Sequence, residues 1–187
     1  MASRLRRAHH TLYRTHLCRG KYALAERPIL INNWEATYFG FNEEKIVEIA
    51  MAGKEMGLEL FVLDDGWFGK RDTDNCSLGD WVVDKKKLPN GLDHLAKRIN
   101  ELGMKFGLWF EPEMVSPDSD LYRAHPDWCI HVPGRTRTQA RQQLILDLSR
   151  ADVCDYIIEA VSSVLRSAPI SSRRPSGLRK TRFSSNS

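Results

Sequence analysis

Two adjacent carboxylates, Asp64 and Asp65, directly follow the apolar run at residues 60–63 and precede Gly66 and Trp67. Four consecutive apolar residues are typical of a parallel strand that is buried on both faces. The carboxylates then stand at the carboxyl end of that strand, where ligand-handling residues collect in parallel α/β folds. Carboxylates accept hydrogen bonds from vicinal hydroxyls, and an indole covers the apolar face of a pyranose. The pattern favours a sugar site; the alternative is an acidic turn that merely ends a strand.

Alternating strand and helix patterns predict the scaffold that positions these carboxylates. Apolar runs predict strands at residues 29–31, 60–63, 106–110 and 144–146. Apolar residues at helical spacing follow the first, second and fourth of these runs. Strands that alternate with helices indicate βα units and a parallel sheet, so the predicted fold class is α/β.

The boundaries of the predicted helices follow from capping signals. Asn42 is the predicted N-cap of the first helix, and Gly57 is its predicted C′ residue. Ser149 and Asp152 have the spacing of a capping box and predict the start of the last helix. The residues predicted to face inward on these two helices are Ile46, Ile49, Ala50, Met56, Val153, Tyr156, Ile157, Ala160, Val161 and Val164.

Polar or aromatic residues occur at the end of each predicted strand. Because the carboxyl ends of parallel strands meet at one edge of a sheet, we expect these residues to form one site. In strand order, they are Trp34, then Asp64 and Asp65, then Trp109, Glu111 and Glu113, then Arg141 and Asp147.

Five of the charged or aromatic residues have less specific patterns. Glu111 and Glu113 project to opposite sides of an extended Glu-Pro-Glu segment, which favours loop support over a paired acid/base role. Asp147 is as compatible with structural support as with a ligand role. The loop that carries Asp80 and Trp81 is expected to pack against the protein; the alternative is closure over a substrate.

The formal net charge of +4 is unevenly distributed along the chain. Of the 28 basic residues, six lie in residues 1–21 and five lie after residue 172, and neither segment contains an acid. The middle of the chain therefore holds 17 basic residues against all 24 acidic ones. Nucleic-acid-binding domains carry their basic residues on the folded surface, so we expect no nucleic-acid partner.

The four cysteines show no Cys-x-x-Cys spacing, and the histidines near the N-terminus lack a spaced Cys or carboxylate partner. This usage indicates free thiols in a reducing compartment, so we expect a cytoplasmic protein without a metal site. We also expect no membrane partner, because no apolar run approaches the roughly 18 residues of a membrane span. No signal-peptide h-region is expected either.

Five ordered stretches carry a family resemblance. They read Asn-Asn-Trp-Glu-Ala-Thr-Tyr-Phe at 32–39, Asp-Asp-Gly-Trp-Phe at 64–68, Gly-Asp-Trp at 79–81, Gly-Leu-Trp-Phe-Glu-Pro-Glu-Met at 107–114 and Gln-Leu-Ile-Leu-Asp-Leu-Ser at 143–149. In order and spacing they resemble the microbial α-galactosidases (melibiases) of glycoside hydrolase family thirty-six. The resemblance extends from about residue 12 to residue 170.

The resemblance implies a retaining glycosidase on a (β/α)₈ barrel that releases terminal α-D-galactose from galactosides such as melibiose and raffinose, without a cofactor. It implies that Asp64 and Asp65 hold the 4- and 6-hydroxyls of galactose. It further implies that Trp34 and Trp109 wall the pocket and that Arg141 makes another polar contact to the sugar.

The catalytic pair implied by the resemblance is not expected in this chain. In the family, the nucleophile is the Asp of a Lys-Trp-Asp motif that ends the next strand, and the acid/base lies further on. No Asp or Glu follows Glu159 here. We therefore expect no catalytic residue among the 187, and the alternative function is a non-catalytic galactoside-binding or non-functional remnant.

Three segments are expected along the chain. Residues 1–27 form a linker that precedes the barrel, and residues 28–170 form the N-terminal half of the barrel, with about four βα units. Residues 171–187 form a disordered basic tail that is read out of frame. The full-length family is expected to be homo-oligomeric. A half-barrel is prone to self-association through the open edges of its 29–31 and 144–146 strands.

Overall fold

The structure is a computed structural model that describes residues 2–20, 23, 25–137, 139 and 141–167. The predicted tail at 171–187 lies outside the described residues. The elements are α1 (Ala2–Leu12), the π-helix η1 (Tyr13–Leu17), β1 (Leu30–Asn32), α2 (Trp34–Thr37), α3 (Glu43–Glu55), β2 (Leu60–Leu63), α4 (Gly91–Glu101), β3 (Lys105–Leu108), β4 (Met114–Val115), α5 (Asp120–Ala124), the 3₁₀-helix η2 (Pro126–Trp128), β5 (Leu144–Ile145) and α6 (Ala151–Ser167).

Three strands form a parallel sheet in the order β1-β2-β3. Phe61 at the centre of β2 pairs with Ile31 of β1 and Phe106 of β3. The first three predicted strands are therefore confirmed as parallel neighbours, with boundaries shifted by at most two residues. The α/β class is confirmed for this part of the chain.

The fourth predicted strand does not join the parallel sheet. Leu144 of β5 pairs with Val115 of β4 in an antiparallel ladder of two short strands. A parallel strand needs a crossover connection, usually a helix, whereas the described residues between β3 and β5 form β4, the five-residue α5 and η2. The expectation that the 144–146 strand is an open edge of the parallel sheet is therefore also wrong: the edges of that sheet are β1 and β3, and β5 belongs to the separate two-stranded ladder.

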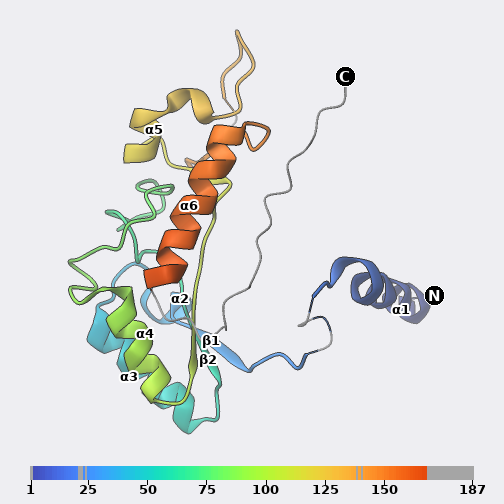
Figure 1. The fold of residues 1–187 in the computed structure, drawn as a ribbon, viewed down its shortest axis with the longest axis vertical. Coiled ribbons are helices and arrows are strands. Elements are labelled where there is room, and N and C mark those ends of the chain that lie inside the picture. The colour runs from blue at the N-terminus through green and yellow to red at the C-terminus, as the bar shows by residue number, and fades with distance from the viewer. Residues whose placement is uncertain (1, 21–22, 24, 138, 140, 168–187) are drawn as a thin grey trace.

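Helices α3 and α4 cover one face of the parallel sheet and form the main core with it (Figure 1). Ile46 and Ala50 of α3 are fully buried in this core, as are Leu95 and Ile99 of α4. The predicted cap of α3 is confirmed, because the Asn42 side chain accepts a hydrogen bond from the backbone N–H of Lys45 at 2.9 Å. This geometry satisfies one of the unpaired donors at the helix N-terminus.

The C-terminal end of α3 differs from the prediction at one residue. Met56 is 71% exposed, not inward-facing. The helix ends at Glu55, and Met56 has φ −81° and ψ 0° as its C-cap, so the helical spacing no longer applies to it. Gly57 follows with φ +84°, the left-handed conformation expected of a C′ glycine.

Helix α6 connects two apolar clusters. Val164, near its C-terminal end, is buried in the main core, whereas Val153 is buried in a second cluster with β4, β5 and η2. The predicted capping box is wrong: the Ser149 hydroxyl donates to Asp147 at 2.6 Å, and Asp152 pairs with Arg150. Ser149 has a nearer carboxylate than the helix terminus, and α6 begins two residues later.

The connection between β2 and α4 is itself largely buried. Most of its apolar residues lie in the main core, although Val82 is exposed and the segment has no regular helix or strand of its own. The expectation that the Asp80-Trp81 loop packs against the protein is confirmed, because Trp81 is 5% exposed. The fully buried apolar side chains of this connection are Trp67, Phe68, Leu78 and Leu88.

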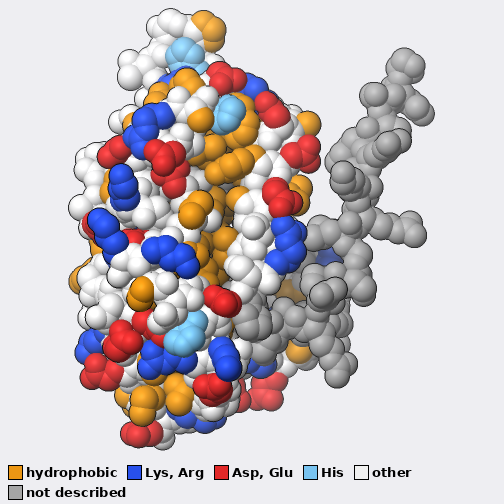
Figure 2. All heavy atoms as spheres, turned by 60° about the vertical axis from the view of Figure 1, so that its left-hand side comes forward, with side chains coloured by type: hydrophobic (Ala, Val, Ile, Leu, Met, Phe, Trp, Pro, Cys, Tyr) orange, Lys and Arg blue, Asp and Glu red, His pale blue; other side chains and the backbone are white. Residues whose placement is uncertain are grey.

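The remaining features are the position of α1 and the distribution of side chains on the surface. Figure 1 shows α1, within the expected linker, apart from the sheet and the other helices. Figure 2 shows a band of hydrophobic side chains on one face, with basic and acidic side chains along its borders. Among the described residues, no helix is both long and apolar enough to cross a membrane.

Candidate functional site

The ends of β1 and β2 are joined by a short series of hydrogen bonds. The Asn32 amide donates to the Asp64 carboxylate at 2.8 Å, and its carbonyl oxygen accepts from the backbone N–H of Trp34 at 3.2 Å. The Trp109 backbone N–H donates to the Leu63 carbonyl at 2.9 Å, next to Asp64. The structure therefore brings Trp34, Asp64 and Trp109 together at the carboxyl ends of three neighbouring strands.

Asn33 fixes the loop after β1 relative to β2. Its side chain is fully buried; the Oδ1 atom accepts from the backbone N–H of Asp64 at 2.9 Å, and the amide donates to Thr37 at 2.9 Å. A buried amide needs such partners, because an unpaired polar group in the interior is costly. We did not predict this role; the only sequence signal is the Asn-Asn pair at the strand end.

Asp65 differs sharply from its neighbour because it forms a buried ion pair. Asp65 is 3% exposed, and the Arg71 side chain that it binds is 0% exposed. Arg71 Nε lies 3.0 Å from Asp65 Oδ1, and Arg71 Nη2 lies 2.9 Å from Oδ2, so the contact is bidentate. Asp64, by contrast, is only half-buried. Sequence reasoning missed Arg71, because its burial depends on the path of the loop.

Arg141 is linked to this ion pair through Asp74. Arg141 Nη2 lies 2.8 Å from Asp74 Oδ1, and Arg71 Nη2 lies 3.7 Å from the same oxygen. The structure thus connects Arg141 to Asp65 by a chain of ion pairs, although 76 positions of sequence separate the two residues.

Glu111 has a partly buried carboxyl group with a raised pKa. Burial is the largest effect on its pKa and raises it. Glu113 and Asp65 also raise the pKa, Arg141 and Arg71 lower it, and the net shift is upward. Its Oε2 atom is buried and has no hydrogen-bond partner among the described residues. Glu113 is exposed, so the two carboxylates lie in different environments.

The two tryptophans of the predicted pocket are held by aromatic neighbours. The Trp109 ring stacks on Phe68 at a centroid distance of 6.4 Å, and the buried Trp67 indole donates to the Trp109 carbonyl at 3.1 Å. The Trp34 ring meets Phe39 edge-on at 5.1 Å. Partly exposed, braced indoles of this kind can cover the apolar face of a sugar ring.

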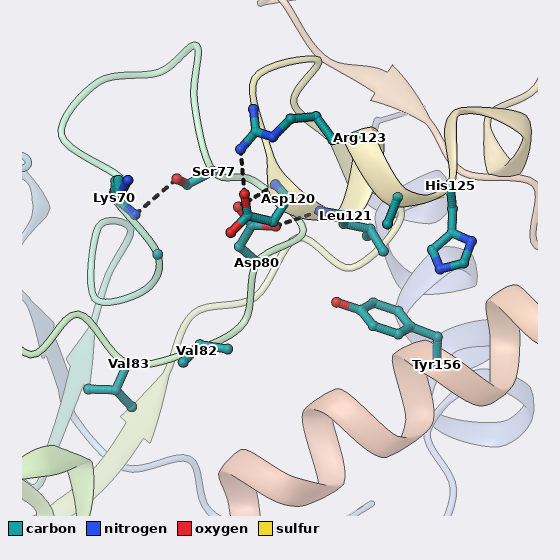
Figure 3. Close-up of a pocket in the computed structure, with 12 residues that line it drawn as sticks. Lys70, Ser77, Asp80, Val82, Val83, Asp120, Leu121, Arg123, His125 and Tyr156 are labelled. Atoms are coloured by element: carbon teal, nitrogen blue, oxygen red, sulfur yellow. Dashed lines mark hydrogen bonds and ion pairs between the residues drawn. The ribbon is translucent and has the colours of Figure 1, made fainter.

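A cavity of about 520 Å³ lies elsewhere, between the β2–α4 connection, α5 and α6 (Figure 3). Burial raises the pKa of Asp80 there, and the backbone N–H groups of Leu121 and Asp120 donate to its carboxylate at 2.9 and 3.0 Å. The Tyr156 hydroxyl donates to the Gly79 carbonyl at 3.0 Å. None of the residues predicted from sequence to bind the sugar lines this cavity. The hydrogen bonds of Asp80 and Tyr156 in this cavity connect the β2–α4 loop to α5 and α6.

The chemistry available at the strand ends is polar recognition. Asp64, Asp65 and Arg141 supply charged acceptors and donors, and Trp34 and Trp109 supply apolar faces. Asp147 is half-buried, and hydrogen bonds from Ser149 lower its pKa, so its side chain belongs to the turn before α6. Within the described residues, no group of three or more His, Cys, Asp and Glu side chains is placed to hold a metal ion.

Comparison with known proteins gives a consistent set of similarities. The family model described as Melibiase matches residues 2–174. Alpha-galactosidase AgaA of Geobacillus stearothermophilus is 70% identical over 162 residues, which are 87% of this chain and 22% of the relative. Alpha-galactosidase Mel36A of Lactobacillus acidophilus is 53% identical over 168 residues, covering 90% of this chain and 23% of the relative.

Solved structures agree with these relatives. The crystal structure of AgaA, a GH36 alpha-galactosidase, superposes with a TM-score of 0.82 at 70% identity and covers 86% of this chain and 22% of that one. The galactosidase domain of AgaSK gives a TM-score of 0.80 at 50% identity, with 84% and 22% covered. AgaA variants have been crystallised with raffinose and with stachyose. This chain spans little more than a fifth of the length of these relatives.

Proposed function

This chain belongs to the Melibiase family, and from that premise we propose that it supplies the galactose-binding part of an α-galactosidase-type retaining glycoside hydrolase. The substrates are galactosides with a terminal α-D-galactose, such as melibiose and raffinose. The three parallel strands are the first three of a (β/α)₈ barrel.

The four free cysteines support a reducing, cytoplasmic location.

One observation carries the proposal: Trp34, Asp64 and Trp109 meet at the carboxyl ends of three adjacent parallel strands, with Asp65 directly beside Asp64. In this assignment the two carboxylates accept hydrogen bonds from the 4- and 6-hydroxyls of galactose. The two indoles wall the pocket, and Arg141 donates to the sugar. A carboxylate has about four acceptor positions, so Asp65 can accept from a hydroxyl while it binds Arg71.

The catalytic pair is assigned to the part of the enzyme that the relatives have beyond the matched fifth. A retaining glycosidase uses two carboxylates about 5 to 5.5 Å apart, one as nucleophile and one as acid/base. Neither Asp64 nor Asp65 is free for that chemistry, because hydrogen bonds and an ion pair fix both as polar contacts. The 187-residue chain alone is therefore expected to show no hydrolysis of an aryl α-galactoside above background.

A segment exchange tests this function. In the exchange enzyme, the segment of G. stearothermophilus AgaA that matches this chain is replaced by the corresponding residues of this chain. The expected result is a folded enzyme that hydrolyses raffinose. Asp64→Ala in that enzyme is expected to lower kcat/KM by about tenfold to a hundredfold, the effect of losing a hydrogen bond to a charged group. A folded exchange enzyme without activity would reject the proposed function.

Self-association follows from the same assignment. β1 and β3 are edge strands of the parallel sheet, and Ile29 and Leu30, at the start of β1, are exposed apolar residues. Unpaired edges with apolar side chains are templates for association. Isolated chains are therefore expected to assemble with one another, and sedimentation velocity at several concentrations measures this directly. A monodisperse monomer with a cooperative melt would contradict the expectation.

A further inference from the structure

Two of the proposed sugar contacts, Asp65 and Arg141, are joined by a series of alternating charges. Asp65 binds Arg71 at 2.9 Å, Arg71 lies 3.7 Å from Asp74, and Asp74 binds Arg141 at 2.8 Å. The series begins in the interior, where Asp65 and Arg71 are buried, and ends at the surface, where the side chains of Asp74 and Arg141 are each about half exposed.

Asp74 is anchored from the buried side. Arg71 Nη1 donates to the backbone carbonyl of Asp74 at 2.9 Å and to that of Cys76 at 2.8 Å. The same guanidinium therefore holds the backbone and faces the carboxylate of Asp74. A planar guanidinium with several fixed partners has little freedom to move. The Asp74 carboxylate thus stands at a position that the interior of the protein determines.

Arg141 is held in a strained conformation. Its φ is +52°, and that of Gln142 is +56°, so two consecutive residues with side chains adopt the left-handed region. Such backbone persists only where the surroundings hold it, and it clusters at functional sites. The Arg141 guanidinium donates to the Asp74 carboxylate at 2.8 Å. This hydrogen-bonded ion pair orients the guanidinium.

We propose that Asp74 is a positioning residue that holds Arg141 toward the sugar site, and that Arg71 ties this position to Asp65. The inference rests on the proposed function, because it explains how Asp65 and Arg141, from distant parts of the chain, are held at one sugar site. Asp74 itself does not touch the sugar. Its removal acts through Arg141 and weakens binding of the galactosyl group.

The competing explanation is an ordinary surface ion pair. Exposed pairs contribute little to stability, so Asp74→Asn is expected to leave the melting temperature almost unchanged under either explanation. The distinguishing measurement is the KM for raffinose in the exchange enzyme. Asp118→Asn is a matched control, because Asp118 forms an exposed ion pair of the same 2.8 Å length with Arg123.

Four variants of the exchange enzyme make the test: Asp74→Asn, Arg141→Ala, the two combined, and Asp118→Asn. Arg141→Ala is expected to raise KM about tenfold or more. Asp74→Asn is expected to raise KM about threefold to fivefold with little change in kcat, as for loss of uniform binding. The combined variant is expected to match Arg141→Ala alone, because Asp74 acts only through Arg141. Asp118→Asn is expected to leave KM unchanged.

The outcomes separate the inference from the proposed function. An unchanged KM in Asp74→Asn, together with a raised KM in Arg141→Ala, overturns the inference and leaves the function intact. Additive effects in the combined variant also overturn it. An active exchange enzyme in which Arg141→Ala has no effect removes Arg141 from the sugar site and the inference with it. An inactive but folded exchange enzyme rejects the proposed function and, consequently, both assignments.

Discussion

Two buried carboxylates, Glu43 and Asp65, are each bound by an arginine, but their networks end in different places. Glu43 is 1% exposed and accepts from Arg98 at 2.6 Å and from Asn90 at 3.1 Å, with His94 Nδ1 at 2.7 Å. All of these partners belong to α4 or its N-cap, so the cluster clamps α3 to α4.

The Asp65 network instead leads outward, through Arg71 and Asp74 to the strained Arg141. Beside it, Glu111 keeps a buried oxygen without a partner among the described residues. The difference teaches how to separate stabilising polar clusters from functional ones. The partners of Glu43 all lie at the α3–α4 contact, whereas the Asp65 network ends at a strained residue and lies beside an unsatisfied acceptor. Backbone strain and unsatisfied polar groups are more common at functional sites than elsewhere.

The largest expected effect tests the interior end of the Asp65 network. Arg71→Met removes the guanidinium and leaves Asp65 buried without its counter-charge, so the free energy of unfolding is expected to fall by about 3–5 kcal/mol. Urea unfolding of the chain, followed by tryptophan fluorescence, measures the loss. The double variant Asp65→Leu with Arg71→Met removes both charges and is expected to recover part of it. Equal losses in the single and double variants would contradict the ion-pair explanation.

A smaller effect is expected at the Glu43 cluster. Glu43→Gln keeps the shape of the side chain but weakens its charged hydrogen bonds, at a cost of about 1.5–3 kcal/mol. The loss is smaller than for Arg71→Met because Arg98 and His94 are partly exposed and regain water. In the exchange enzyme, the KM for raffinose is expected to stay at the parent value. A raised KM would break the distinction between the two clusters.

The smallest expected effect concerns pH. Burial raises the pKa of Glu43, but hydrogen bonds from Arg98, Asn90 and His94 outweigh it, and the folded-state pKa lies below the usual 4.5. Its stabilisation is therefore present above pH 4.5 and is lost as the pH falls through the lower folded-state value. For Glu111, whose pKa is raised, the contribution is present below pH 4.5 and is lost as the pH rises through the folded-state value.

Urea midpoints from about pH 3 to about pH 7 test both signs. Glu43→Gln is expected to flatten the acid side of the profile. Glu111→Gln is expected to make the chain slightly more stable than the parent near neutral pH. A Glu111→Gln variant that is less stable at neutral pH would show that the ionised carboxyl has a stabilising partner, and the contrast with Glu43 would disappear.

The features predicted correctly depend on short-range patterns. The apolar runs located three parallel strands, and Asn42 was identified as a cap because its side chain acts on a backbone group three residues away. The position of Asp64 and Asp65 beyond β2 followed from the same run. The predictions of an inward-facing Met56 and of a capping box at Ser149 were wrong. The exact end of a helix depends on which neighbouring group competes for the hydrogen bond.

The features that sequence reasoning missed depend on the paths of the loops in the folded structure. Only a loop was predicted between β2 and α4, yet this connection buries Trp67 and Arg71 completely. Whether an apolar run such as 144–146 joins the main sheet or pairs with β4 depends on the partner that lies nearby, which its own residues do not encode. For the same reason, the link between Asp74 and Arg141 was not predictable from spacing.

Helix α6 has a consequence for the order in which the chain folds during synthesis. Its Val164 completes a core whose other buried residues lie between Phe41 and Phe106, and its Val153 completes the later cluster. A ribosome releases the chain from its N-terminus at roughly 5–20 residues per second. The strands and the two helices that cover them therefore emerge several seconds before Val164. During that interval the nascent chain exposes an apolar surface that a chaperone can bind.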